Sequence, residues 1–564
     1  MRCFLKGLLV FLATFAALVL VHLPVLGLPY FWDETGYYIP AARDFYRFWL
    51  LIPTSTQPEG HTPLVMIYLG LAWRLCGYSA WVTRAAMTLI ATATVVSLYR
   101  LGRHLASREI AAWSALLLAL SPLFFAQTTL AHLDLAAALF TTLAVRFLLA
   151  KQPWLFALAA SLAILSKETA MVLLPVVWLC TWRRERGLSE GHRARVLVWA
   201  PLVAPLVPLA VWAIYYHHAT GYWTGNREYL SYNLYSTLSP ARFFWSLVRR
   251  AYELLVGGFH WLLIAGATAG WWWGRKHGTR DTGYGVRDTG NDMLGTDYAT
   301  RQAGDAIPER ELFQKDSGRT TWGGRDAPSP SLASRIPCPA PRTLWRRFAL
   351  LTSGLFAVYL LLLSVVGGAI LPRYLLPVLP LFYLVAVALV TRLPRFPARL
   401  ILATAAACFL WAWFINPPYP FPFEDNLAYV DFIRLHEQAA HFLEARAGQA
   451  RILTAWPATG ELTSPFLGYT SRPLRVVPLP SFTRQAFAGV QPESFDLLYL
   501  YSRQWDPPGN WLEHSLHWLQ MQRRYFKYQP QIADEALVAR YHLRLVAEMK
   551  RRGQWVRIYA QTSQ

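Results

Sequence analysis

The chain has 564 residues, of which 54% are hydrophobic and 15% charged, and its mean hydropathy is +0.25. This composition is too apolar for a soluble protein of that length and indicates a polytopic membrane protein. The net charge of +21 does not indicate nucleic-acid binding, because the basic residues fall in short clusters between apolar runs. The five cysteines include no CxxC pair, so neither a disulfide framework nor a zinc site is expected.

The first apolar run spans residues 4–27 and is accompanied by the basic residues Arg2 and Lys6. A cleavable signal peptide is one interpretation of such a run. However, the run is longer than a typical signal-peptide core and lacks an Ala-x-Ala ending. We therefore expect a retained membrane helix with its N-terminus in the cytoplasm.

Two adjacent carboxylates, Asp33 and Glu34, follow this helix within the aromatic stretch 30–38. Placing charged side chains at the end of a membrane helix costs free energy, and such residues usually have a functional role. The alternative is a solvated loop whose acids cap a helix that begins near Thr35.

The first outer loop is expected at residues 28–79, and two short helices are predicted within it. Residues 41–49 alternate aromatic and charged side chains at helical spacing, as in a helix that lies on the membrane surface. The apolar run 64–73 is too short to span a bilayer, so we interpret it as a second juxtamembrane helix. Counting it as a span would place the arginines of residues 100–108 outside, against the positive-inside rule.

The remaining apolar runs and their flanking basic residues predict about eleven spanning helices in a helical bundle. One of them begins at Asp134, and two shorter ones flank the outward turn 166–169. The others are expected at residues 4–27, 80–99, 110–126, 196–216, 252–273, 348–366, 374–390 and 400–415.

Two segments differ in composition from this membrane domain, which covers residues 1–415. Residues 275–343 are rich in Gly, Asp, Arg and Thr without apolar periodicity, which predicts a disordered cytoplasmic loop. Residues 417–564 alternate strand-like runs, such as 451–455, with helical patterns, such as 532–549. This alternation predicts a small C-terminal α/β domain on the outer face.

Seven polar residues lie in or beside the predicted outer loops. The topology that places them there is predicted from the basic residues of the inner loops alone. Incidental polar residues would divide between both faces, so their grouping indicates an outward-facing site. A carboxylate there can act as general base toward an acceptor hydroxyl or amine, while Lys and Arg hold a departing phosphate. The residues are Asp33, Glu34, His61, Asp134, Lys167, Glu168 and Arg373.

Each of these residues also has a structural interpretation, which the sequence leaves open. The acids would then cap helices. Lys167 and Glu168 would form a local ion pair, and Arg373 would anchor the chain at lipid headgroups. His61, which precedes Thr-Pro, would be an ordinary loop residue.

Five motifs, in order, carry a resemblance to a known family. They are Trp-Asp-Glu-Thr-Gly-Tyr-Tyr at 32–38, His-Thr-Pro-Leu at 61–64, Ala-His-Leu-Asp-Leu at 131–135, Leu-Ser-Lys-Glu-Thr-Ala at 165–170 and Leu-Pro-Arg-Tyr-Leu-Leu-Pro at 371–377. Residues 1–415 thus resemble the integral-membrane glycosyltransferases of the GT-C type. Within that type they are most similar to the protein O-mannosyltransferase and lipid A aminoarabinose transferase branch.

The resemblance implies an inverting transfer of a hexosyl or pentosyl group from a polyprenyl-phosphate donor to an acceptor on the outer face. No cofactor and no metal are implied. The acceptor is left open between a protein, a lipid and an envelope glycan. The resemblance implies catalytic roles for Asp33, Glu34 and Asp134, and donor-phosphate binding by His61, Lys167 and Arg373.

The predicted protein therefore lies in the plasma (inner) membrane, with its site and C-terminal domain outside the cytoplasm. A transporter or flippase of lipid-linked saccharides is an alternative, since it also needs charge within the membrane. Transporters tend to show matching broken helices in two halves, and no such pairing is found. A structural or assembly protein, in which the outer domain would be the active part, is a third possibility.

Overall fold

The computed structural model describes residues 2–58, 60–185, 199–277, 342–417, 421–503, 515–526 and 530–562. Residues 1–279 and 340–564 form one compact unit. The predicted disordered loop at 275–343 falls almost entirely on residues 278–341, which lie outside the described ranges.

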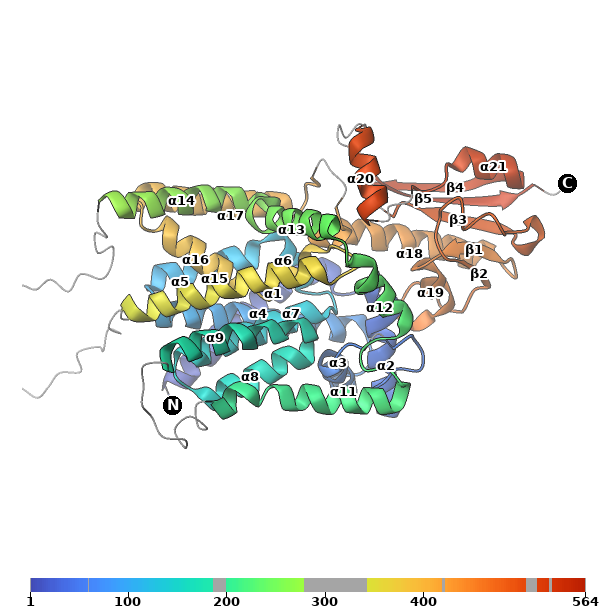
Figure 1. Cartoon of the computed structure of the whole chain (residues 1–564). Coiled ribbons are helices and arrows are strands. Elements are labelled where there is room, and N and C mark those ends of the chain that lie inside the picture. The colour runs from blue at the N-terminus through green and yellow to red at the C-terminus, as the bar shows by residue number, and fades with distance from the viewer. Residues whose placement is uncertain are drawn as a thin grey trace, which may run out of the picture. The chain divides into compact units, whose positions relative to one another are not determined.

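The larger part of this unit is a bundle of helices that run side by side (Figure 1). The bundle supports the predicted mainly α fold. Its helices are α1 (Arg2–His22), α4 (Ala80–Leu105), α5 (Arg108–Leu120), α6 (Pro122–Gln127), α7 (Leu133–Leu149), α8 (Pro153–Ser166), α9 (Leu173–Glu185), α11 (Leu206–Thr220), α13 (Pro240–Leu255), α14 (His260–Lys276), α15 (Arg342–Val365), α16 (Leu379–Val390) and α17 (Arg395–Ala412).

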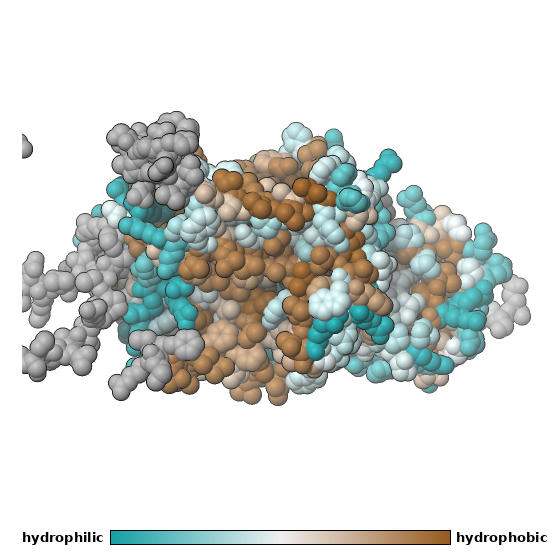
Figure 2. All heavy atoms as spheres, turned by 90° about the horizontal axis from the view of Figure 1, so that it is seen from below, coloured by the Kyte–Doolittle hydropathy of each residue, from teal (hydrophilic) through white to brown (hydrophobic). Residues whose placement is uncertain are grey.

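A broad hydrophobic band covers the bundle and lies between more hydrophilic ends (Figure 2). Among the described residues, five helices are long and apolar enough to cross a membrane, or six if the bent pair at 240–276 counts as one span. Four shorter apolar helices accompany them. The chain is therefore an integral membrane protein, and its number of spans is approximate.

The predicted span 252–273 is wrong at its beginning. The membrane helix there is α14, which starts at His260. It is preceded by a break in which Gly258 and Phe259 both have positive φ, and by the amphipathic helix α13, which the sequence analysis did not identify. The apolar run continues through the break, so hydropathy alone does not reveal it.

Two other predicted spans are interrupted. The predicted helix 110–126 divides at Ser121, whose hydroxyl caps α6 by accepting a hydrogen bond from the Phe124 amide at 3.4 Å. The predicted helix 374–390 is reduced to α16, which follows a 3₁₀ turn at Pro372–Leu375. This turn places Arg373 at the end of the bundle nearest the C-terminal part.

Two short helices, α2 (Ile39–Phe48) and α3 (Leu64–Cys76), lie at the end of the bundle nearest the C-terminal part (Figure 1). They pack closely, since a Cβ on Gly70 of α3 would lie 2.5 Å from the Phe45 ring. Large apolar side chains such as Phe48 and Trp49 remain exposed beside Arg47. This arrangement fits the predicted juxtamembrane helices.

The C-terminal part contains a five-stranded sheet with the order β2-β1-β3-β5-β4. Strand β1 is parallel to β2 and β3, whereas β3–β5 and β5–β4 are antiparallel. The strands are β1 (Ile452–Ala455), β2 (Val476–Leu479), β3 (Leu497–Tyr501), β4 (Leu543–Arg551) and β5 (Gln554–Gln561), and the helices are α18 (Ala428–Arg446), α19 (Ala458–Thr463), α20 (Leu516–Phe526) and α21 (Asp534–Tyr541). The expected small α/β domain is present.

The helical pattern predicted at 532–549 is wrong in its second half. Helix α21 ends at Tyr541, His542 adopts a positive φ of 51°, and the chain continues as β4. The strand pairs with β5, so tertiary pairing overrides the local helical pattern.

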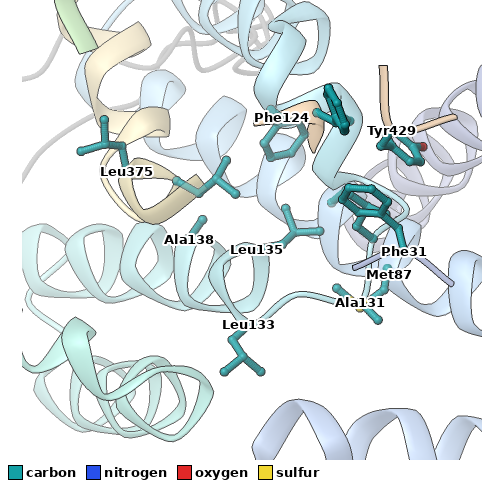
Figure 3. Packing of buried hydrophobic residues seen from close by; sticks show 14 of the residues in the cluster. Phe31, Met87, Phe124, Ala131, Leu133, Leu135, Ala138, Leu375 and Tyr429 are labelled. Atoms are coloured by element: carbon teal, nitrogen blue, oxygen red, sulfur yellow. The ribbon is translucent and has the colours of Figure 1, made fainter. Parts of the chain in front are cut away.

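The apolar core continues from the bundle into the C-terminal part. Figure 3 shows Phe31, from the loop after α1, between Tyr429 of α18 on one side and Met87 of α4 and Ala131 on the other. The rings of Phe31 and Tyr429 lie 5.8 Å apart. This packing fixes the loop that carries Asp33 between membrane helices and the α/β part.

Candidate active site

The loop after α1 holds Asp33 in a constrained backbone. Trp32 has a φ of 45°, a left-handed conformation that is rare for a large non-glycine residue. A π-helical turn at Glu34–Tyr38 follows. Asp33 precedes this turn but makes no capping hydrogen bond with its side chain. Its carboxylate, 18% exposed, pairs with Arg373 instead.

Arg373 is the centre of the polar network, although only 1% of its side chain is exposed. Its Nη2 donates to Asp33 Oδ2, and its Nη1 donates to Glu424 Oε2 at 2.9 Å. Its Nε lies 3.7 Å from Asp134 Oδ2. One guanidinium therefore neutralises charge on three carboxylates from distant parts of the chain, and it is too buried to be a headgroup anchor.

His132, between α6 and α7, completes the contacts of Arg373. Burial, with Arg373 as the next cause, lowers the pKa of His132 well below its usual range, so the ring is neutral. A neutral ring can donate from Nδ1 to Gln127 Oε1 at 2.7 Å and accept from Arg373 Nη1 at Nε2, at 3.0 Å. His132 thus orients the guanidinium without adding a competing charge.

Lys167 and Asp134 form a second buried ion pair at the same end of the bundle. Lys167 Nζ donates to Asp134 Oδ1 at 2.6 Å. The ammonium also lies 3.9 Å from the centre of the Tyr374 ring. Lys167 therefore pairs with Asp134, and its neighbour Glu168 has a different partner.

That partner is His61, whose Nδ1 lies 3.1 Å from Glu168 Oε2. The ring of Tyr38 separates this pair from the Arg373 network, with centroid distances of 6.4 Å to His61 and 5.9 Å to His132. His61 also lines a pocket with Tyr38, Met66 and Trp212.

Glu34 points away from the network, although it adjoins Asp33. It is fully buried and shares both carboxylate oxygens with Arg84, at 3.0 to 3.2 Å. The amides of Phe31 and Ala131 donate to the same carboxylate, at 2.7 and 2.6 Å. All of its bonding capacity is used within the protein, so Glu34 holds the loop in place and has no free oxygen for a substrate.

Arg250 of α13 adds a third buried cation, which the sequence analysis did not identify. Its Nη1 donates to Leu371 O and, at 3.4 Å, to Glu253 Oε2, while neither Nε nor Nη2 has a hydrogen-bond partner among the described residues. The guanidinium lies 5.3 Å from the centre of the Tyr374 ring, whose other neighbours include Lys167 and Arg373. Buried N–H groups without partners are costly, and an anionic ligand would satisfy them.

Glu424, between α17 and α18, was also missed from the sequence. It follows the aromatic and proline-rich run 417–423, much as Asp33 follows Tyr30-Phe31-Trp32. The repeated pattern of an acid pair after aromatic residues is the signal that could have identified it. Burial outweighs the attraction of Arg373 and raises the pKa of Glu424 to about 7.

A raised pKa at Glu424 predicts that the stability of the protein falls as pH rises. Between the ordinary glutamate pKa and about 7, the folded state binds the extra proton, so raising pH favours unfolding by up to about 1.4 kcal/mol per pH unit. Neutral His132 has the opposite effect below the ordinary histidine pKa, so we expect the melting temperature of the purified protein to decrease from about pH 6.5 to pH 8. The Glu424→Gln variant should lose this decrease, and an unchanged pH profile in that variant would contradict the assignment.

The predicted site residues are thus only partly brought together. Asp33, Asp134, Lys167 and Arg373 meet in one network, His61 lies one ring away, and Glu34 belongs to a separate ion pair. The network adds residues that were not predicted as site residues, namely His132, Arg250, Tyr374 and Glu424.

Known proteins resemble this chain in part of its sequence and in its fold. A family model described as dolichyl-phosphate-mannose-protein mannosyltransferase matches residues 60–215. ArnT from Cupriavidus metallidurans in the apo state has the same fold, with a TM-score of 0.54 and 14% identity over 99% of this chain and 98% of that chain. ArnT bound to undecaprenyl phosphate gives a TM-score of 0.52 and 15% identity over 98% and 97% of the two chains.

A complex of the Saccharomyces cerevisiae protein O-mannosyltransferases Pmt1 and Pmt2, bound to the sugar donor, matches with a TM-score of 0.31 and 17% identity over 41% of this chain and 36% of that chain. No curated protein matches the chain in sequence. The resemblance predicted from the five motifs is confirmed by the family model and by the fold shared with ArnT.

Proposed function

We propose that the chain is a membrane glycosyltransferase that moves one sugar from a polyprenyl-phosphate donor to an acceptor. The observation that carries the proposal is the partly exposed Asp33, which lies at the same end of the bundle as the buried cations Arg373, Lys167 and Arg250. A base beside phosphate-binding cations is what such a transfer needs. The family-model match and the fold shared with a protein that binds undecaprenyl phosphate support the donor class.

The proposed reaction is a single displacement. The acceptor oxygen or nitrogen bonds to the anomeric carbon while its proton passes to Asp33. The bond from that carbon to the phosphate oxygen breaks, and its electron pair leaves with the polyprenyl phosphate. Attack from the face opposite the leaving group inverts the anomeric carbon. The reaction consumes no other reactant and, in this proposal, uses no metal ion.

The buried cations and their neighbours have different roles in this proposal. Arg250 offers two unused N–H groups to the phosphate, and Lys167 adds a charge whose present partner is Asp134. Asp134 therefore positions Lys167, whereas Glu34 positions the loop. His61, which the ring of Tyr38 separates from the Arg373 network, would contact the sugar of the bound donor.

We further propose that the site and the α/β part face the extracytoplasmic side of the plasma membrane. The helix ends opposite the site carry basic residues, such as Arg100 and Arg103 at the end of α4. Arg275 and Lys276 end α14 in the same way. Basic residues prefer the cytoplasmic side, so this distribution favours the proposed orientation.

A matched pair of neighbouring arginines tests the donor site. The purified protein should bind undecaprenyl phosphate and release it from lipid-linked sugars extracted from native membranes. Arg250→Gln should weaken this binding at least about tenfold, because a charge-assisted contact is lost. Arg249→Gln is the control, because Arg249 is 38% exposed and pairs with Glu253 on the same helix.

The assay also separates transfer from transport. A flippase would move the lipid-linked sugar between leaflets and leave the sugar-phosphate bond intact. Chromatography of the lipid extract shows whether free polyprenyl phosphate is formed. If the lipid-linked sugar stays intact in the presence of native membrane acceptors, the proposed transferase function is wrong.

A further inference from the structure

The α/β part presents one edge of its sheet to the loop that carries Asp33. Strands β1 and β3 are parallel, so their carboxyl ends lie at the same edge, followed by Trp456 and by Ser502-Arg503. The ring of Trp456 lies 5.0 Å from that of Trp32, directly before Asp33. A Cβ on Gly36 would lie 2.6 Å from Trp456 Nε1, so this contact requires glycine.

This edge contains the point at which the strand order reverses. From β1 the chain goes to β2 on one side and then crosses to β3 on the other. In open α/β sheets, ligands bind in the crevice outside the carboxyl ends of the strands at such a reversal. Here the position lies between β1 and β3. The usual ligand position of an open α/β sheet therefore lies next to the proposed base.

Hydrogen bonds fix the chain on both sides of the position between β1 and β3. The Tyr501 hydroxyl donates to Ala455 O at 3.1 Å and to Trp456 O at 2.6 Å, which ties the end of β3 to the end of β1. The Trp555 amide of β5 donates to Ser502 Oγ at 3.0 Å. The two loop ends are therefore fixed before any ligand arrives, which lowers the entropic cost of binding.

Arg503 is the charged group at this position. Its guanidinium lies 5.9 Å from the centre of the Trp32 ring. Within the described part of the chain, no carboxylate forms an ion pair with it, and its side chain is half-buried. The other cations near Asp33 either have carboxylate partners or belong to the donor site. Arg503 therefore offers planar N–H donors to an anionic group on the acceptor side of Asp33.

We infer that the α/β part binds the acceptor, and that Arg503 pairs with a phosphate or carboxylate carried by the acceptor near its reacting hydroxyl or amine. The inference rests on the proposed function and specifies its acceptor class. Trp32 and Trp456 would contact a sugar ring of the acceptor, since aromatic faces pack against the C–H face of sugars. The anionic group would hold the nucleophile next to Asp33.

The test uses three sugars as competitors of transfer to acceptors in native membrane extracts. They are glucose 6-phosphate, glucuronate and the neutral glucose. For the wild-type protein we expect competition by one or both of the anionic sugars and none by glucose at the same concentration. Competition by the phosphate alone identifies a phosphorylated acceptor, and competition by glucuronate alone identifies an acidic sugar.

Arg503→Gln should lose this competition and raise the acceptor concentration for half-maximal transfer about tenfold, while undecaprenyl phosphate binding stays unchanged. Arg503→Lys, which keeps the charge, should recover part of the effect. Arg475→Gln is the matched control, because Arg475 is exposed and precedes β2, at the opposite edge of the sheet.

Three results would overturn the inference. The first is that wild type and Arg503→Gln need the same acceptor concentration for half-maximal transfer, with transfer intact in both. The second is equal competition by glucose and the anionic sugars. Both leave the transferase function standing. The third is a wild-type protein that neither binds undecaprenyl phosphate nor transfers sugar, in which case the proposed function and this inference both fail.

Discussion

Asp33→Asn should reduce sugar transfer about 10²- to 10⁴-fold, the range expected when a general base is removed. The amide keeps the size of the carboxylate and can still accept a hydrogen bond from Arg373, but it cannot take the acceptor proton. Binding of undecaprenyl phosphate should be retained, because the buried cations are unchanged. The measurement is the initial rate of polyprenyl phosphate release at equal membrane abundance.

Glu109→Gln provides the control for this substitution. Glu109 lies on α5, is 46% exposed and pairs with the exposed Arg399, so its loss should leave the rate unchanged. A rate for Asp33→Asn within a factor of two of wild type would remove Asp33 from the proposed mechanism. A loss of protein from the membrane would instead assign the residue a role in folding.

Arg373→Gln should destabilise the protein by about 3–5 kcal/mol, because it leaves buried carboxylates without their shared cation. Asp33 and Glu424 both lose their direct ion pair, and Asp134 keeps only Lys167. The expected result is a strongly lowered melting temperature, together with lost transfer. Arg399→Gln, which breaks the exposed pair with Glu109, should cost about 1 kcal/mol or less.

A double variant separates the electrostatic cause from a simple loss of packing. If unpaired negative charge destabilises Arg373→Gln, then adding Glu424→Gln should restore part of the melting temperature. The gain should be larger at pH 8 than at pH 5, since Glu424 is ionised mainly above its raised pKa of about 7. If the two substitutions lower the melting temperature additively, the guanidinium of Arg373 acts through packing.

The sequence predicted the architecture well where hydropathy and charge determine it. The first membrane helix, the juxtamembrane helices and the C-terminal α/β domain follow from apolar runs, basic clusters and strand-like alternation. The breaks inside apolar runs were not predictable in this way. The positive φ of Gly258 lies in the break between the end of α13 at Leu255 and the start of α14 at His260, although the hydropathy is continuous.

In the site, as in the fold, the sequence pattern predicts some features, whereas the local backbone geometry determines others. Asp33 and Glu34 are equivalent in the sequence, yet a left-handed Trp32 and a π-helical turn send one carboxylate to Arg373 and the other to Arg84. No periodic pattern encodes this separation, because neither conformation is regular. Glu424 could not be placed either, since its partner Arg373 is 51 residues away along the chain.

The ion pair between Asp33 and Arg373 has a consequence for the order of events in catalysis. In the structure Asp33 pairs with Arg373, and a donor phosphate would compete with Asp33 for the same guanidinium. Arrival of the donor would therefore release the base, so that the donor binds first and the acceptor is activated second. Without a donor, Asp33 stays occupied.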